Sequence, residues 1–136
     1  MTGDIAHDGE ANAYQLYNQL TSGLNSKILT IPGNHDALET MNAIIHPEQL
    51  QDCYQCQSWC FIMLNSVVPG QAHGSLATTE LQKLEGLLEQ HSHLNIMICL
   101  HHHPVPVSSE WLDQHMLDNP EPFFNLLGNY NKIRAI

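Results

Sequence analysis

The chain has 136 residues, 43% of them hydrophobic, which is enough for one domain with a hydrophobic core. Four Lys and Arg face 14 Asp and Glu, and this net charge of −10 argues against a nucleic-acid partner. Because the chain has neither a long apolar run nor a basic, apolar start, we expect no membrane span and no signal peptide, and therefore a cytoplasmic protein.

The spacing of apolar and turn residues predicts helices and strands that alternate along the chain. Helices are predicted over residues 10–20, 37–45 and 78–90, with a short one after Pro120. Strands are predicted over residues 27–31, 59–64, 96–100 and 132–136. This alternation favours an α/β fold in which helices cover both faces of the sheet.

The cysteines allow two interpretations. Cys53, Cys56 and Cys60 resemble part of a zinc knuckle that His46 could complete. A closed zinc site normally has a second close-spaced pair of ligands, which is absent, and Cys60 and Cys99 belong to apolar runs as buried thiols do. We therefore expect reduced cytosolic thiols rather than a zinc site.

A polar turn follows the predicted strand at residues 27–31. Pro32 and Gly33 end the strand, so Asn34, His35 and Asp36 lie just past a strand end, where open α/β sheets place their ligands. An amide oxygen, an imidazole and a carboxylate can bind a metal and move a proton. The alternative is a surface turn whose Asn and Asp only satisfy local backbone groups.

Two further strand-end clusters favour the first interpretation. They are Gly3-Asp4 and the run His101-His102-His103 before Pro104. Asp4 can bridge two cations with its two oxygens, and Asn34 and His102 offer an oxygen and a nitrogen suited to Mn, Fe or Zn. Two cations about 3.5–4 Å apart can activate water and neutralise a phosphate. His35 could then protonate the leaving alkoxide or stabilise charge in the transition state.

These residues resemble the calcineurin-like metallophosphoesterases. The family signature runs Asp-x-His, Gly-Asp, Gly-Asn-His-Asp/Glu, a His, and Gly-His-x-His, and the three middle blocks occur here in order. The segments 101–106 and 111–119, together with His73-Gly74, resemble more specifically the bacterial class III 3′,5′-cyclic-nucleotide phosphodiesterases of the cyclic AMP type.

The resemblance implies roles for residues at matching positions. Asp4 would bridge the metals, Asn34 and His102 would bind the second metal, and His35 would assist the leaving group. His103, Trp111 and Asp113 would contribute to substrate binding; packing and loop hydrogen bonding are the alternatives for His103, and a packing anchor for Trp111.

The resemblance also implies what these 136 residues lack. We expect residues 1–136 to be the central portion of a single metallophosphoesterase domain, a partial αββα sandwich truncated at both ends. The Asp-x-His block of the signature is expected before residue 1, and the Gly-His-x-His block after Ile136. The intact protein would hold two divalent transition metals (Mn, Fe or Zn), whereas these residues would bind at most one, weakly, and hydrolyse little. Open sheet edges would favour homo-oligomers.

The implied function of the intact protein is metal-dependent hydrolysis of a small phosphodiester, with 3′,5′-cyclic AMP as the expected substrate. Two alternatives stay open at this point. One is a non-catalytic truncated chain that binds a metal or a partner. The other is a phosphodiesterase for glycerophosphodiesters, because pocket loops rather than the metal core set the substrate.

Overall fold

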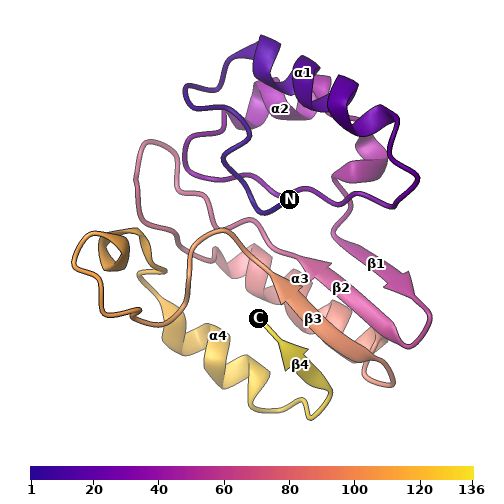
Figure 1. The fold of residues 1–136 in the computed structure, drawn as a ribbon. Coiled ribbons are helices and arrows are strands. Elements are labelled where there is room, and N and C mark those ends of the chain that lie inside the picture. Colours follow the sequence, from indigo (N-terminus) through magenta and orange to yellow (C-terminus); the bar gives the residue numbers. More distant parts are fainter.

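The structure is a computed structural model that describes residues 1–136 (Figure 1). The helices are α1 (Ala11–Ser22), α2 (Leu38–Ile44), α3 (Thr78–Gln90) and α4 (Pro120–Leu127), with short 3-10 turns at Pro47–Gln49 and Leu112–His115. The strands are β1 (Cys53–Cys56), β2 (Trp59–Met63), β3 (Asn95–Cys99) and β4 (Ile133–Ala135). None of the helices combines the length and the apolar character that crossing a bilayer requires.

The predicted helices are confirmed, and each has a clear local cause. α3 begins at Thr78 and buries Leu84 and Leu88, which lie one turn apart on a single face. α4 begins with Pro120 at its first position, where the missing N–H costs nothing, and it buries Phe123 and Leu127 at the same spacing. The predicted strands near residues 59–64, 96–100 and 132–136 also form.

Two predictions about strands were wrong. Residues 27–31 make only an isolated parallel bridge, between Thr2 and Ile31, because the segment at Thr2 is their only strand partner and Pro32-Gly33 then turns the chain. Residues 53–56, which the sequence offered only as spaced cysteines, form β1 instead. A turn with Gln57 at φ 53° joins β1 to β2 as a hairpin.

The four strands form one mixed sheet in the order β1-β2-β3-β4. β1 runs antiparallel to β2, whereas β2, β3 and β4 run parallel to one another. α3 connects β2 to β3 and α4 connects β3 to β4, as parallel neighbours require. The predicted α/β class is therefore confirmed, and the loop that follows β3 begins at Leu100 and carries His101.

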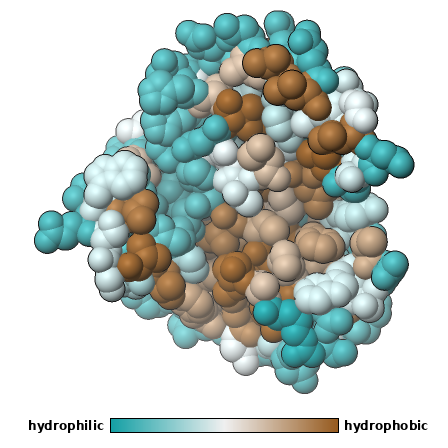
Figure 2. All heavy atoms as spheres, viewed as in Figure 1, coloured by the Kyte–Doolittle hydropathy of each residue, from teal (hydrophilic) through white to brown (hydrophobic).

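The main hydrophobic core lies between the sheet and the helices α3 and α4. Alternate strand residues face these helices and are fully buried, among them Ile62 on β2 and Ile96 on β3. The opposite face carries half-buried side chains such as Phe61 and Met97. Figure 2 shows hydrophobic residues, in brown, gathered on the visible surface over the middle of the molecule. The expectation of helices on both faces was wrong for these residues, since α3 and α4 share one face.

The other two helices belong to a second cluster. α1 and α2 pack together through Tyr14, Tyr17, Met41 and Ile45, and Ala6 completes this cluster. In Figure 1 the pair lies at the top of the molecule, next to the N-terminus. The polar turn at residues 33–36 directly precedes α2, so this cluster positions one side of the candidate site described next.

Candidate functional site

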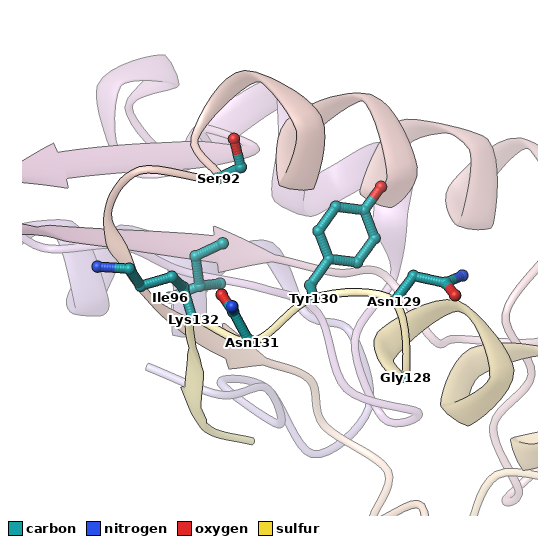
Figure 3. A pocket seen from close by; sticks show the side chains of 7 residues that line it. All are labelled: Ser92, Ile96, Gly128, Asn129, Tyr130, Asn131 and Lys132. Atoms are coloured by element: carbon teal, nitrogen blue, oxygen red, sulfur yellow. The ribbon is translucent and has the colours of Figure 1, made fainter.

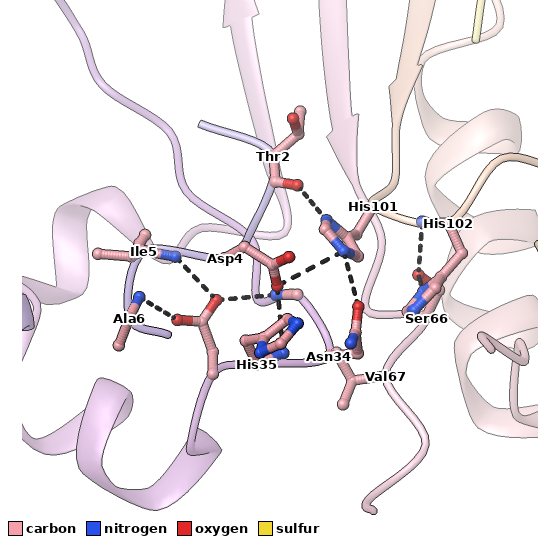
Figure 4. Close-up of polar contacts among 12 residues, drawn as sticks. Thr2, Asp4, Ile5, Ala6, Asn34, His35, Ser66, Val67, His101 and His102 are labelled. Carbon is pink, nitrogen blue, oxygen red and sulfur yellow. Dashed lines mark hydrogen bonds and ion pairs between the residues drawn. The ribbon is translucent and has the colours of Figure 1, made fainter. Parts of the chain in front are cut away.

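Three loops distant in sequence meet at one place, as the sequence predicted (Figure 4). The first carries Asp4 and precedes α1, the second carries Asn34 and His35 and precedes α2, and the third carries His101 and follows β3. The parallel bridge between Thr2 and Ile31 brings the first two loops together. Together these loops line one pocket.

Three electron-pair donors face one another in this pocket. His101 Nε2 lies 3.1 Å from Asn34 Oδ1 and 3.5 Å from Asp4 Oδ1. Because His101 Nδ1 lies 2.6 Å from the carbonyl oxygen of Thr2, which can only accept, Nδ1 carries a proton. The Nε2 of a neutral His101 therefore presents a lone pair to two oxygens that also carry lone pairs. A proton on His101 or a bound cation satisfies this arrangement.

The separations fit a metal ion. Ligands about 2.1 Å from a cation lie about 3.0–3.5 Å from one another in octahedral or tetrahedral shells. The distances from His101 Nε2 to Asn34 and Asp4 fall in this range. Carboxylate, amide and imidazole together suit Mn, Fe or Zn. The residues present thus match part of the donor set that a metallophosphoesterase requires.

Two glycines allow the loops to approach this closely. A Cβ on Gly33 would overlap Asp4 Oδ1 and lie 2.8 Å from the His101 ring. Gly3 has φ +96°, and a Cβ there would lie 2.6 Å from the backbone nitrogen of Gly33. The glycines of the Gly-Asp and Gly-Asn-His-Asp motifs therefore serve the contact between the loops.

His35 is held with one nitrogen free. Its Nδ1 lies 2.8 Å from the carbonyl oxygen of His7, so Nδ1 donates and Nε2 is the nitrogen left to exchange a proton. The ring of His7 stacks on that of His35 with centroids 4.9 Å apart. The backbone N–H of His35 also donates to Asp4 Oδ1 at 3.1 Å, which connects the two motifs directly.

Asp36 has a different role from its two neighbours in the motif. Its carboxylate is 7% exposed and accepts hydrogen bonds from the backbone nitrogens of Ala6 and Gly33, at 3.0 and 2.9 Å, and from the Tyr14 hydroxyl at 3.1 Å. A weaker bond comes from the nitrogen of Ile5 at 3.3 Å. Asp36 therefore satisfies backbone groups, as the alternative for this turn predicted, but most of them are distant in sequence. It clamps the Asp4 loop to the Asn34 loop.

His102, the ligand selected from the sequence, lies beside His101 and lines the same pocket. It is 2% exposed; its Nδ1 lies 2.8 Å from the hydroxyl of Ser66, and its Nε2 is buried without a partner. Burial, followed by the nearby charge of His101, lowers the pKa of His102 to about 4, so the ring is neutral near pH 7. Gly74 packs directly on this ring, and no Cβ would fit there. A neutral imidazole with an unpartnered nitrogen suits a metal ligand as well.

The pocket has a volume of about 260 Å³, and residues of the 3-10 turn line part of it. Its lining residues are Asp4, Asn34, His35, His101, His102, His103, Trp111, Leu112 and His115. Two of the three residues predicted to bind substrate, His103 and Trp111, are among them. Trp111 is 68% exposed, and its ring lies 4.8 Å from that of His115.

The third predicted substrate residue, Asp113, supports the loop. Its carboxylate accepts the backbone N–H of Val107 at 2.8 Å and lies 3.5 Å from His103 Nε2. The hydrogen bond from Val107 and the contact with His103 lower the pKa of Asp113, so the carboxylate stays charged. Asp113 thus connects the residues after the His run to the turn that carries Trp111.

A second pocket, of about 360 Å³, lies at the other end of the sheet (Figure 3). Its lining residues are Ser92, Ile96, Gly128, Asn129, Tyr130, Asn131 and Lys132. It contains no His, Cys, Asp or Glu and so offers none of the usual side-chain ligands of a transition metal. The candidate metal ligands therefore lie in the pocket of Figure 4.

Sequence reasoning missed several residues of this pocket. The motifs give His101 no ligand role, yet it makes the direct contacts to Asp4 and Asn34. His7 belongs to no motif, but it orients His35. Ser66, whose hydroxyl contacts His102, belongs to no motif, so only the tertiary structure reveals this contact.

No family model matches the chain. The chain is 39% identical to a protein of Vesicomyosocius okutanii named "Probable cyclic nucleotide phosphodiesterase", and the match covers 100% of this chain and 58% of that protein. It is 35% identical over 99% of its length to the 3′,5′-cyclic adenosine monophosphate phosphodiesterase CpdA of Vibrio vulnificus, of which it covers 50%. The CpdA of Pseudomonas aeruginosa is 31% identical, and the match covers 99% of this chain and 50% of that protein. The chain thus spans about half the length of the curated relatives it matches.

Proposed function

We propose that the protein to which these residues belong hydrolyses 3′,5′-cyclic AMP. The reason is that this chain is similar over its whole length to part of the cyclic nucleotide phosphodiesterases. The resemblance expected from the motifs is confirmed by these relatives. The observation that carries the proposal is the convergence of Asp4 Oδ1, Asn34 Oδ1 and His101 Nε2 within 3.1–3.5 Å. Such a cluster of electron-pair donors is suited to a divalent transition metal, Mn, Fe or Zn.

In this proposal Asp4, Asn34 and one histidine of the run at residues 101–103 form the metal-binding part of the pocket. The two direct contacts support His101, and the buried, unpartnered Nε2 supports His102, the residue that the motif selects. Divalent cations, when bound, supply Lewis-acid activation of water and neutralise charge on the phosphate. The strongly negative chain would otherwise repel an anionic substrate.

His35 would manage the proton on the leaving group. The His7 carbonyl holds Nδ1 in its protonated form, so the other nitrogen, Nε2, is the one that exchanges protons. A protonated His35 can donate from Nε2 to the departing alkoxide. Its backbone N–H to Asp4 keeps the ring next to the metal-binding residues.

The pocket rim would bind the rest of the substrate. His103 and the exposed Trp111 line the opening, and an indole ring can stack on a purine. Asp113 would act from behind, through the loop that it holds at Val107. A phosphodiesterase for glycerophosphodiesters remains the enzymatic alternative, because such a substrate needs the same metal core but offers no base to Trp111.

We further propose that residues 1–136 alone bind at most one transition metal weakly and hydrolyse little. The chain covers 50–58% of the relatives described above, and the donors found in the pocket make up only part of a two-metal centre. An incomplete shell binds its cation weakly. A non-catalytic role in binding a metal or a partner is the second candidate for this chain, favoured by the same partial coverage. Association through open sheet edges receives no support from the fold or the relatives.

The metal site is tested by Mn²⁺ binding, followed by electron paramagnetic resonance, on the chain and its Asp4→Asn, Asn34→Ala and His101→Ala variants. We expect each substitution to weaken binding at least about tenfold. His93→Ala is the matched control, because His93 is exposed and lies outside the pocket. Mn²⁺ binding that survives all three substitutions would refute the site. A loss with His102→Ala but not with His101→Ala would assign the ligand to His102.

The reaction is tested on bis-para-nitrophenyl phosphate and on 3′,5′-cyclic AMP with added Mn²⁺. Robust metal-dependent turnover by residues 1–136 would overturn the proposal that they hydrolyse little. Genomic DNA on either side of the coding segment separates the two functions. In-frame Asp-x-His and Gly-His-x-His blocks would support the enzyme, and an interrupting stop or frameshift would support the non-catalytic chain.

A further inference from the structure

A second group of metal-binding side chains lies away from the pocket of the proposed phosphodiesterase. Cys53, Cys60 and His91 place a ligand atom each within 4.8 Å of one another. Cys53 Sγ lies 3.9 Å from His91 Nε2. None of these residues belongs to a phosphoesterase motif found in the sequence.

The fold explains why these three residues meet. The β1–β2 register pairs Cys53 with Ile62 and Gln55 with Cys60, which makes the two cysteines diagonal neighbours on one face of the hairpin. That is the face covered by α3, and His91 is the residue that ends this helix. Cys56 lies an odd number of residues from Cys53 and therefore on the opposite face, where it is exposed. The ligand set considered from the sequence, with Cys56 and His46, was therefore wrong.

The cluster is buried and its polar groups lack good partners. Cys60 is 0% exposed and His91 is 8% exposed, whereas Cys53 is half-buried and reaches towards solvent. His91 Nδ1 is buried without any hydrogen-bond partner. The single contact to sulfur at 3.9 Å is weak compensation for burying an imidazole. A cation on Nε2, the nitrogen that faces Cys53, would replace this weak contact with a ligand bond and would leave Nδ1 as it is.

The chemistry of the three groups favours a soft metal over a reactive thiol. Burial, followed by the neighbouring Cys53, raises the pKa of Cys60 to about 11, so the metal-free thiol is protonated and a poor nucleophile. Two thiolates and a neutral imidazole together carry two negative charges, which balance one divalent cation. Thiolate ligands select Zn²⁺ or Cu(I) over Mg²⁺ or Ca²⁺.

We infer that Cys53, Cys60 and His91 form a binding site for one Zn²⁺ that is independent of the phosphodiester pocket. Each thiol releases its proton to solvent when the cation binds, and His91 binds as the neutral ring. Cys53 is only partly buried, so solvent can supply a water as the fourth ligand. The cation would join the β1–β2 hairpin to the end of α3 and so stabilise the sheet edge.

The site is tested by titrating the reduced 136-residue chain with Co²⁺, whose bonds to thiolate give a near-ultraviolet charge-transfer absorption. Oxygen and nitrogen ligands do not produce this absorption, so metal in the phosphodiester pocket cannot mimic it. We expect one equivalent to bind with tetrahedral ligand-field bands, and Zn²⁺ to displace it. Cys53→Ser and His91→Gln should weaken Co²⁺ binding at least about tenfold. Cys56→Ser and Cys99→Ser are the matched controls and should leave it unchanged.

Two further measurements keep the outcome decisive. Circular dichroism checks that the variants fold, and Zn²⁺ should raise the melting temperature of the parent chain but not that of Cys53→Ser. Absence of the thiolate absorption in the folded, reduced parent chain would overturn the inference, as would an unchanged absorption in Cys53→Ser. A Cys53–Cys60 disulfide that forms in air and is unaffected by Zn²⁺ would overturn it too. Because the Asp4→Asn variant should retain the absorption, failure of the phosphodiester site does not affect this test.

Discussion

Replacing Asp36 with Asn should destabilise the fold more than its place in a surface turn would indicate. The carboxylate divides its four hydrogen bonds evenly: Oδ1 accepts from Ala6 N and Tyr14 Oη, and Oδ2 accepts from Ile5 N and Gly33 N. An amide keeps only one oxygen, so two bonds are lost. Its NH₂ group would then point at two donors.

The magnitude follows from the two lost bonds. A hydrogen bond to a charged group contributes about 1.5–3 kcal/mol, so Asp36→Asn should lower the free energy of unfolding by about 3–6 kcal/mol. The free energy of unfolding of a typical domain is only about 5–15 kcal/mol, so this loss is a large fraction of it. For a chain of this length it corresponds to a fall in melting temperature of about 10–20 °C.

Tyr14 offers a second measurement of the same network. Burial raises its pKa to about 12, so the hydroxyl remains a donor to Asp36 while it accepts the Ala37 N–H at 2.9 Å. Tyr14→Phe should cost about 1–3 kcal/mol. Urea unfolding of both single variants and the double variant gives their coupling energy, expected at about 0.5–3 kcal/mol. Tyr54→Phe on β1, outside the network, is the matched control.

The reasoning is refuted if Asp36→Asn unfolds within about 1 kcal/mol of the parent chain with an unchanged denaturant slope. It is equally refuted if the two substitutions prove additive, because residues that share a hydrogen bond must couple. If the network holds the Asp4 loop in place as described, Asp36→Asn should also weaken Mn²⁺ binding although Asp36 lines no part of the pocket.

Three further predictions concern pH, backbone and charge. Burial lowers the pKa of His102 from 6.5 to about 4, so only the unfolded chain binds this proton between those two pH values. The free energy of unfolding should therefore decrease as the pH is lowered through this range, by at most about 1.4 kcal/mol per pH unit. In His102→Gln, urea midpoints measured across the range should depend less on pH. Gly33→Ala should destabilise strongly, since its Cβ would overlap the neighbouring loop, whereas Gly86→Ala in α3, with open space around it, should raise the melting temperature slightly. Glu80→Ala should cost about 1–2 kcal/mol in urea unfolding, because it breaks the ion pair with Lys83 and frees a backbone N–H, and the loss should shrink at high salt.

The order of helices and strands followed from local pattern. The bounds of α3 agree with the prediction at both ends, because its leucine spacing and its starting residues are local signals. The strand at residues 27–31 failed for the opposite reason. Strand formation depends on a partner, and the only bridge there comes from Thr2.

Some residues of the candidate site could likewise be predicted from the sequence, and others only from the tertiary structure. Residue types and their order made Asp4, Asn34 and His35 candidates, because the motifs that carry the resemblance consist of adjacent residues. Spacing could not decide how adjacent residues orient, so Asp36 as a clamp and His101 as the residue in contact with Asn34 emerged only from contacts between loops.

The sequence by itself determined the helices, three of the four strands and the motifs of this protein, because these depend on neighbours along the chain. Only the tertiary structure decided which face each strand residue takes and what meets it there. The strand register separates Cys56 from Cys53 and Cys60, and the end of α3 brings His91 to the latter pair. No sequence pattern within a single segment predicts that these three residues lie together, because their contact depends on how a hairpin and a helix pack.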